Sequence, residues 1–319
     1  MTNLKLFCKD REYKQKIAPL TERVNLCLYF GKIQKDFFLL KSLIIFSTII
    51  KILEEDQMAY NLIWTFSNEE DLKLVNNFIK EYKLNMEVSD YSIQEKESSS
   101  FYVENICLNI KEEVFSLLED IKEFNKFLIL TSKYNEKTDV SPDSLKVYIK
   151  NYRKMYKSIL VANKIKCSEK EALENETPKR LIEMKEEFLF HAKNDLNLFG
   201  ASQIIFREVK YLNKLVKGKK TSEVKVYCWW YSTLLKELGE SVGIFNISPK
   251  LALKEMNKFL VKKRYDVETY HKIKKLIIER HDARMNKDFV SADKIMEELS
   301  KYQLDLHDYS KFTYWEAQI

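Results

Sequence analysis

The sequence predicts two structural parts, a small α/β region followed by a mainly helical region. The 319 residues are 45% hydrophobic, which is enough to bury the core of one large domain or of two to three smaller ones. Only 5 Gly and 4 Pro are present, and long stretches without either residue favour helices over a loop-rich or all-β fold. Short apolar runs typical of strands occur near the N-terminus, whereas from Lys111 onward the apolar residues recur with helical periodicity.

The N-terminal region has the order strand, helix, strand. The apolar run 24–30 (VNLCLYF) predicts a buried strand, and 59–66 (AYNLIWTF) predicts a second one. Between them, the length of 39–53 and the placement of its lysines favour a helix over a strand. Asn68 is a suitable N-cap for a following helix, and the polar stretch 93–100 predicts a loop. Such an order within about 45 residues is typical of the opening of a Rossmann-like, nucleotide-binding sheet.

The helical region is divided by proline and by polar stretches. Pro142 and Pro178 each follow a hydroxyl residue, a sequence that favours the start of a helix. Loops are expected at 168–176 and 217–221. The predicted helices are 111–130, 141–163, 177–192, 200–216, 222–238, 249–262, 267–285 and 291–302.

The charge is unevenly distributed. The net charge of +6 permits nucleic-acid binding without demanding it. Between positions 254 and 287, however, there are 11 Lys or Arg against 5 Asp or Glu. This local excess suits contact with phosphate groups, and on charge alone a solvated helix face is an equally good interpretation.

Cysteine use and hydropathy indicate the cellular setting. The 5 cysteines are odd in number and form no C-x-x-C pair, which favours a reducing compartment without a disulfide framework. The apolar run 39–53 is interrupted by Lys41 and Lys51, so it is too short and too charged for a membrane span. No secretory signal opens the chain. We therefore expect an intracellular, cytoplasmic protein without a membrane partner, with a mitochondrial location as the alternative.

The segment 277–315 carries a series of chemically distinctive residues at fixed spacing. They are Arg280, Ala283, Arg284, Lys287, Asp288, Phe289, Ala292, Asp293, Ile295, Leu299, Leu306, Asp308 and Trp315. This series resembles the C-terminal anticodon-binding helices of cysteinyl-tRNA synthetases, which follow R-x-x-A-R-x-x-K-D-[FW]-x-x-A-D-x-I-x-x-x-L, then L-x-D and a terminal Trp. The resemblance continues upstream at 3–7, 17–20, 127–145 and 188–213. It implies a class I synthetase-like fold whose N-terminal domain is reduced, because 72–101 stands where the family has a much longer stretch.

The signatures of nucleotide activation in that family are not found here. Where the resemblance places the H-I-G-H or H-I-G-N motif, the chain reads Asp36-Phe37-Phe38-Leu39, and an acid followed by bulky apolar residues disfavours a triphosphate. Where it places K-M-S-K-S, residues 102–106 contain no lysine and include Glu104. We therefore expect no catalytic residues and no ATP cofactor.

Zinc binding is not expected either. Cys27 occupies the position of the family's first zinc-ligand cysteine, with no Cys or His nearby, and a structural zinc site needs about four ligands. It is a lone remnant of that position, and the simpler interpretation is a small buried apolar residue in a strand.

The resemblance implies that Arg284, Asp293 and Asp308 contact anticodon bases. A guanidinium can donate two parallel hydrogen bonds to guanine, a carboxylate can accept from a base amino group, and single-stranded loops expose these edges. Trp315 or Phe289 could offer a stacking face. The full predicted RNA-binding set is Arg280, Arg284, Lys287, Asp293, Asp308 and Trp315. The structural alternatives are an Arg284–Asp288 helix pair, pairing of Asp293 with a nearby cation, and core packing of Phe289 and Trp315.

These observations predict a three-part chain: a reduced Rossmann-like domain (1–110), a helical bundle (111–265) and an anticodon-binding-like helical segment (266–319). The predicted function is a non-catalytic relative of cysteinyl-tRNA synthetase that binds tRNA or another structured RNA, or serves as a subunit of a ribonucleoprotein or multiprotein complex. The alternative is a divergent cysteine–tRNA ligase that uses ATP and zinc. In that case Lys32, Lys35 and Lys41 would be the cations available to replace the lost phosphate contacts. In a purely structural role, the aromatic cluster 228–231 (CWWY) would bind another subunit, although packing inside the helical region is its simpler interpretation.

Overall fold

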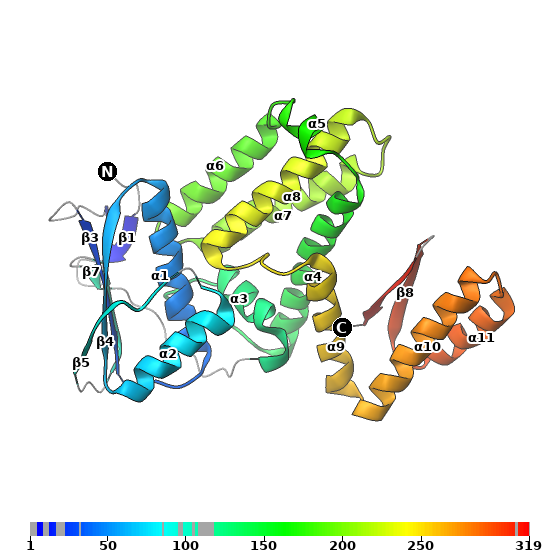
Figure 1. Ribbon diagram of the computed structural model, residues 1–319, viewed down its shortest axis with the longest axis horizontal. Coiled ribbons are helices and arrows are strands. Elements are labelled where there is room, and N and C mark those ends of the chain that lie inside the picture. Colours follow the sequence, from blue (N-terminus) through cyan, green and yellow to red (C-terminus); the bar gives the residue numbers. More distant parts are fainter. Residues whose placement is uncertain are drawn as a thin grey trace. The chain divides into compact units, whose positions relative to one another are not determined.

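The computed structural model describes residues 5–8, 13–16, 23–31, 33–84, 86–94, 98–103, 106–107, 118–309 and 312–318 (Figure 1). The chain separates into two compact units, Met1–Pro249 and Lys250–Ile319, and each is considered by itself. Several sequence predictions fall outside the described residues. They are the segment 17–20, Lys32, Glu104 and the first part of the helix predicted at 111–130.

The first unit contains a five-stranded sheet in the order β5-β4-β3-β6-β7. Strands β3 (Arg23–Phe30), β4 (Ala59–Phe66) and β5 (Asp90–Ile93) run parallel, whereas β6 (Ser100–Val103) and β7 (Ile106–Cys107) run antiparallel to their neighbours. The two strands predicted from apolar runs are confirmed as β3 and β4. The other three are short, with little apolar alternation of their own, and were not predicted. A separate antiparallel pair, β1 (Lys5–Cys8) and β2 (Tyr13–Lys16), precedes the sheet.

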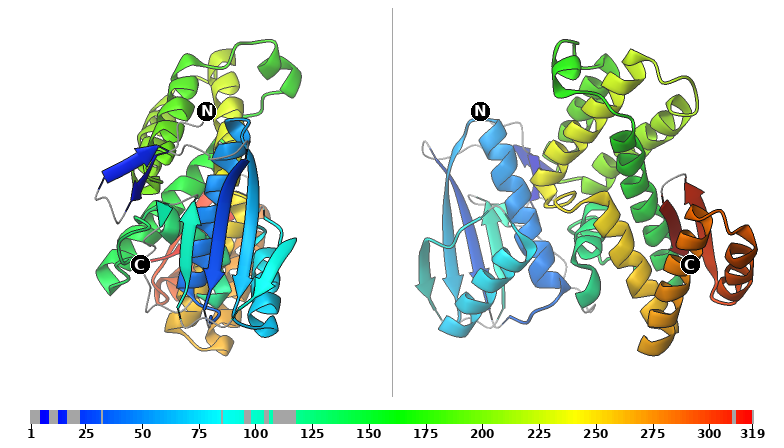
Figure 2. Two further views of the ribbon diagram at one scale, coloured as in Figure 1. Left: turned by 90° about the vertical axis from the view of Figure 1, so that its left-hand side faces the viewer. Right: turned by 45° about the vertical axis from the view of Figure 1, so that its right-hand side comes forward.

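The helices α1 (Phe37–Glu55) and α2 (Glu69–Tyr82) lie on one face of this sheet (Figure 1). In the left view of Figure 2 the strands stand in front of α1. Alternation in β3 turns Val24, Leu26, Leu28 and Phe30 toward the core, where all four are fully buried. The prediction of a β-α-β unit followed by a helix capped by Asn68 is confirmed, since the Asn68 side chain accepts a hydrogen bond from the Asp71 backbone N–H at 2.9 Å.

Helix α1 is buried on nearly all sides because it packs against both β4 and α8 (Ser222–Val242). Its apolar character therefore reflects two packing faces. Within the described residues, none of the helices has the length and apolar content needed to cross a bilayer. Lys41 is fully buried in this helix, and its ammonium donates to the backbone carbonyl of Glu136 at 2.8 Å. A lysine at this position therefore marks a tertiary contact and not a solvated helix face.

The rest of the first unit is helical. Its helices are α3 (Lys122–Leu130), α4 (Pro142–Lys164), α5 (Glu169–Leu173), α6 (Lys179–Lys193), α7 (Leu198–Leu215) and α8, and the short turn η1 (Glu119–Ile121) precedes α3. The loop predicted at 168–176 is wrong at its centre, which forms α5. Ser168 caps this short helix by accepting from the Glu171 N–H at 3.1 Å, and the Trp230 indole N–H donates to the Ala172 carbonyl at 3.3 Å. A contact from α8 thus supports a helix too short to be recognised from its own sequence.

The second unit consists of α9 (Pro249–Arg264), α10 (Val267–Met285) and α11 (Phe289–Ser300), followed by the hairpin β8 (Leu304–Tyr309) and β9 (Phe312–Ala317). The three helices were predicted, α10 with the same bounds. The segment 266–319 was described as helical, with its last helix ending at 302, and the hairpin that follows was not predicted. Asn257 of α9 supplies a physical reason, because its buried side chain donates to the Trp315 carbonyl at 2.6 Å and accepts from the Ala317 N–H at 3.3 Å. The β9 backbone is thereby held extended against α9.

We expect Asn257→Ala to destabilise the hairpin by about 1–3 kcal/mol, because it leaves buried backbone groups of β9 without their side-chain partner. Hydrogen exchange of the Ala317 amide should accelerate in this variant. Gln318→Ala, which removes an exposed bond to Asp305, is the matched control and should leave that rate unchanged. Equal exchange rates in the wild type and Asn257→Ala would show that the ladder alone holds β9.

Candidate functional site

In a Rossmann-like sheet, ligands bind beyond the carboxyl ends of the parallel strands. At the end of β3 this space is closed by the chain itself. The Gly31 backbone N–H donates to Ser99 Oγ at 3.1 Å, and a Cβ at position 31 would lie 2.8 Å from the Ser98 backbone. Only glycine lets the backbone at position 31 come this close to the backbone of Ser98. The glycine is therefore needed for a contact within the protein. Beside it, Ser67 Oγ donates to the Phe30 carbonyl at 3.2 Å, which joins the ends of β3 and β4.

The N-terminus of α1 is also occupied. The Asp36 carboxylate accepts from the Leu39 N–H at 2.9 Å, so it supplies both the cap and the negative charge that such a terminus favours. Phe37 and Leu39 are buried, and the Phe38 ring lies 6.0 Å from that of Phe101 on β6. These side chains do not fit a nucleoside triphosphate, because they place a carboxylate where phosphates would bind and aromatic rings beside it.

Two of the three candidate cations near α1 already have partners. The Lys35 ammonium lies 2.9 Å from the Glu81 carboxylate of α2, and Lys41 is buried on the Glu136 carbonyl. Lys32, the third candidate for a phosphate contact, lies outside the described residues. Either Lys35 or Lys41 would have to break an interaction before it could contact a phosphate.

Cys27 lies half-buried on the sheet face opposite the core residues of β3. Its neighbours are aromatic: Tyr29 approaches the Tyr102 ring edge-on at 5.7 Å, and burial raises the pKa of Tyr29, with Cys27 adding to the shift. In the part of the chain that the structure describes, no three His, Cys, Asp or Glu side chains gather closely enough to hold a metal ion. The surroundings of Cys27 therefore do not fit zinc.

The second unit presents its chemistry where α10 meets α11. Lys287 adopts left-handed backbone angles, and its N–H donates to the Arg284 carbonyl at 3.1 Å. The Asp288 N–H then bonds the Ala283 carbonyl at 2.8 Å, and the Asp288 carboxylate caps α11 through the Ser291 N–H at 3.1 Å. Among these bonds, those with Ser291 lower the pKa of Asp288. Together the bonds fix a tight turn of only three residues between the two helices.

The predicted RNA-binding residues differ in exposure. Lys287 and Asp293 are exposed, and Arg284 is half-buried in the last turn of α10. Arg280 is only 5% exposed and is therefore poorly placed for a direct contact with a ligand. The Lys272 ammonium of α10 bonds the Glu298 carboxylate of α11 at 2.8 Å, which keeps the two helices side by side.

Aromatic and apolar side chains accompany these charges. Phe289 is 55% exposed, so the alternative that it packs in the core is wrong. Met285 and Val290 are also exposed at the same turn and were not predicted as site residues.

The hairpin carries the two remaining predictions. Asp308 pairs with Thr313 in the β8–β9 register, and its side chain lies outside the described residues. Trp315 pairs with Leu306 and is half-buried. Its exposure is therefore lower than expected for an open stacking face and higher than expected for a core residue. Strand β9 packs against α10, as Figure 1 shows. The hairpin and the helix pair therefore form one structural body.

Comparison with known proteins gives one consistent relationship. No family model matches the chain. A cysteine–tRNA ligase of Oleidesulfovibrio alaskensis is 26% identical over 239 residues, which cover 69% of this chain and 49% of the ligase. The corresponding ligase of Maridesulfovibrio salexigens is 27% identical over 241 residues (70% and 49%), and that of Thermodesulfovibrio yellowstonii is 28% identical over 231 residues (70% and 45%).

The fold and these matches together define a protein related to aminoacyl-tRNA synthetases. Within that class, the chain is related to the cysteinyl-tRNA synthetases, as its C-terminal residues indicated. It spans about half the length of the curated relatives it matches.

Proposed function

We propose that this chain is a non-catalytic relative of cysteinyl-tRNA synthetase that binds tRNA or another structured RNA through its second unit. The observation that carries the proposal is the turn between α10 and α11, where Arg284, Lys287 and Phe289 follow one another on a rigid helix pair. A guanidinium, an ammonium and an exposed aromatic ring are the groups with which proteins bind unpaired bases and their phosphates.

Electrostatics supports the same surface. The stretch 254–287 holds 11 basic residues against 5 acidic ones, and α9 ends in the run Lys262, Lys263 and Arg264. Arg280 is buried and does not contribute to this surface. The exposed cations of the stretch favour phosphate by releasing counterions, so the binding should weaken with salt. Asp293 is exposed on α11, where a carboxylate could accept from a base amino group.

The non-catalytic half of the proposal is supported by the closed edge of the sheet. Gly31 contacts Ser98 and Ser99, Asp36 caps α1, and Lys35 and Lys41 are engaged by protein groups. With the space beyond β3 occupied by protein groups, the N-terminal domain can still act as a scaffold for the rest of the chain. Membership of a ribonucleoprotein or multiprotein complex is a natural setting for such a scaffold. ATP–pyrophosphate exchange that depends on cysteine would refute the non-catalytic assignment and favour the divergent ligase.

Arg284→Ala should weaken the binding of a tRNA(Cys) transcript by about 1–3 kcal/mol if the guanidinium contacts a base. Lys287→Ala should weaken all RNAs alike and reduce the salt dependence by about one phosphate contact. Titration at several salt concentrations, with a tRNA of different anticodon in parallel, measures both effects. Lys179→Ala, which removes an exposed charge in the first unit, is the matched control.

The result that would overturn RNA binding is unchanged tRNA mobility at low salt with the wild-type chain. A purely structural role would then be the better account. Binding that is equal in the wild type and in both variants would instead move the interface away from the α10–α11 turn.

The variant Asp36→Ser tests whether the negative charge of Asp36 or the bulk of its neighbours disfavours ATP at the α1 N-terminus. Because serine also caps helices well, stability should change by less than about 0.5 kcal/mol, whereas Asp36→Ala should cost about 1 kcal/mol. We expect ATP binding to stay undetectable in both variants, since Phe37, Phe38 and the Ser98 backbone still fill the space. Calorimetric titration with ATP measures this, and binding gained by Asp36→Ser would show that the carboxylate alone excludes the nucleotide.

A further inference from the structure

The five-stranded sheet of the first unit has helices on one face only. In the left view of Figure 2 the strands lie in front of α1, and no helix of the described residues crosses in front of them. Parallel strands are normally covered on both faces. The open face carries the alternate side chains of β3 that point away from the core, together with the side chains paired with them on β4 and β6. Those that matter here are Arg23, Asn25, Tyr29, Asn61, Ile63 and Tyr102.

Two tyrosines lie next to each other on this face. Tyr102 of β6 is paired with Cys27 of β3, so Tyr29 is its diagonal neighbour. The two rings meet edge to face, with 5.7 Å between their centroids and an interplanar angle of 79°. Both side chains are half-buried, so each ring keeps accessible surface. Proteins that bind single-stranded RNA often place aromatic residues on an open sheet face, where they stack against bases.

Hydrogen-bonding side chains continue this face toward the start of β3 and β4. Arg23 Nη1 donates to Asn61 Oδ1 at 3.1 Å, and Asn61 Nδ2 donates to Asn25 Oδ1 at 2.9 Å. These bonds hold three polar side chains in a row. A hollow of about 500 Å³ adjoins the row, and Arg23, Asn61, Ser89 and Asp90 are among the residues that line it. This volume lies within the usual range for small-molecule sites, and the lining offers both donors and acceptors to the edge of a base.

The composition of the face distinguishes between possible occupants. A covering helix or second sheet would bury a contiguous apolar surface, but the outward side chains of β3 and β4 are mostly polar. Ile63, 39% exposed, is the one large aliphatic side chain among them. Interfaces with nucleic acids are more polar and wetter than those between proteins. Glu87 and Asp90 disfavour a phosphate inside the hollow, whereas a carboxylate accepts from a base amino group, and the exposed Arg23 supplies a cation for a phosphate outside it.

We propose that the open face of the sheet binds a short single-stranded stretch of RNA. Its bases stack on Tyr29 and Tyr102, and the edge of a neighbouring base bonds the polar groups of the hollow beside Asn61. Arg23 contacts the phosphate that links these nucleotides. The face belongs to the first unit, so this contact is separate from the α10–α11 turn and does not require that the second unit binds tRNA.

The probe for a test is a fluorescein-labelled oligouridine of about ten nucleotides, titrated with the full chain at low salt and followed by anisotropy. We expect Tyr29→Ala and Tyr102→Ala each to weaken its binding about tenfold, because each removes a stacking ring. Tyr102→Phe keeps the ring and should stay within about twofold of the wild type. Tyr91→Ala is the matched control, since Tyr91 is 53% exposed in the same sheet but pairs with Trp64 on the opposite face. It should leave binding unchanged.

A second readout needs no variant. Photo-crosslinking of an oligouridine that carries 5-iodouridine to the wild-type chain should attach it to Tyr29 or Tyr102, which mass spectrometry identifies; a crosslink only at other residues would overturn the proposal.

The outcomes separate this contact from RNA binding by the second unit. Arg284→Ala should leave the affinity for oligouridine unchanged. If Arg284→Ala abolishes that binding while the tyrosine variants keep it, the sheet face is not a site and the α10–α11 turn is. Binding that depends on the tyrosines, with unchanged tRNA mobility, would support the sheet face and refute the second-unit function. The proposal also fails if the wild type does not bind oligouridine, or if Tyr102→Ala instead abolishes a dimer seen in sedimentation, because a second copy would then cover the face.

Discussion

Glu123→Ala should destabilise the first unit by about 3–5 kcal/mol at pH 7, because it leaves a buried ammonium without its counter-charge. Glu123 and Lys126 are each 4% exposed, with 3.6 Å between the ammonium and the carboxylate. The Tyr156 hydroxyl donates to the same carboxylate at 2.6 Å, and Lys126 also donates to the Gly243 carbonyl at 2.7 Å. Through these bonds one carboxylate connects α3, α4 and the chain that follows α8.

The loss should depend on pH in a defined direction. Burial lowers the pKa of Lys126 in the folded protein, and removing Glu123 takes away the charge that opposes this shift. Below the folded pKa both states bind the proton and the full cost of the buried charge applies. As pH rises from the folded pKa toward the unfolded value near 10.5, the unfolded state binds more protons, so folding becomes relatively more favourable. The destabilisation by Glu123→Ala should therefore shrink between neutral pH and about pH 10.

Urea unfolding of the full chain at pH 7 and pH 9.5 measures this difference. At pH 7 the midpoint of thermal unfolding should fall by roughly 10 °C for a unit of this size. Glu183→Ala removes an exposed helix pair with Lys179 and is the matched control, with an expected cost under about 1 kcal/mol. A destabilisation that stays constant over this pH range would show that the cost comes from the lost Tyr156 bond and not from the charge of Lys126.

Glu208→Ala should be the second most damaging change, at about 2–3 kcal/mol. The fully buried Glu208 carboxylate on α7 accepts from Arg180 Nε at 2.7 Å and Nη2 at 2.9 Å, and from the Tyr227 hydroxyl at 3.1 Å. It therefore joins α6, α7 and α8 at one point. The cost is smaller than at Glu123 because Arg180, 41% exposed, can turn its charge toward water after the substitution.

This second loss should be insensitive to pH between about 6 and 9. Arginine stays charged throughout, and burial raises the pKa of Tyr227, so neither group titrates in this range. The same urea series tests it, with Glu187→Ala as the control, since Glu187 pairs with Arg207 at the surface. Comparing the two core variants thus distinguishes a buried lysine, which can lose its proton, from a partly exposed arginine, which cannot.

The candidate RNA interface was only partly predictable. The order and spacing of residues 280–315 gave the segment that is proposed as the interface, because base contacts need particular side chains at suitable helical intervals. Exposure could not be predicted in the same way. Arg280 and Arg284 are one turn apart on α10, yet Arg280 is buried and Arg284 is half-buried. Whether an arginine faces solvent depends on what packs beside it.

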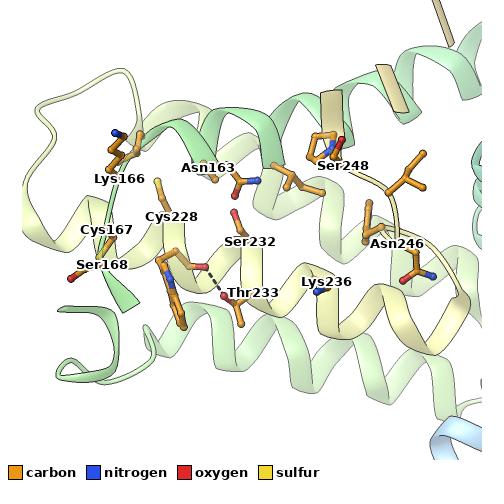
Figure 3. Close-up of a pocket in the computed structure, with 17 residues that line it drawn as sticks. Asn163, Lys166, Cys167, Ser168, Cys228, Ser232, Thr233, Lys236, Asn246 and Ser248 are labelled. Carbon is orange, nitrogen blue, oxygen red and sulfur yellow. Dashed lines mark hydrogen bonds between the residues drawn. The ribbon is translucent and has the colours of Figure 1, made fainter. Parts of the chain in front are cut away.

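The ends of β3 and α1 that face each other across Gly31 and Asp36 show the same division between local and distant contacts. The series Asp36 to Leu39 was enough to predict that a triphosphate would be disfavoured, since charge and bulk are properties of the residues themselves. The contact between Gly31 and the Ser98–Ser99 segment was not predictable, because it joins residues more than sixty positions apart. A cavity of about 970 Å³ beside α8 likewise forms from three separate segments, 159–168, 228–236 and 245–249 (Figure 3).

Local pattern determined β3, β4, α1, α2 and the long helices of this protein, together with its relationship to the cysteinyl-tRNA synthetases. The period of the apolar residues, the capping residues and the spacing of a motif each involve only residues that are close in the sequence. These features can therefore be recognised without knowing the tertiary structure. Only the tertiary structure decided that Lys41 is buried and that the strands 304–309 and 312–317 pair with each other. Each of these depends on a contact with a distant segment, whose free energy is not encoded in the local run of residues.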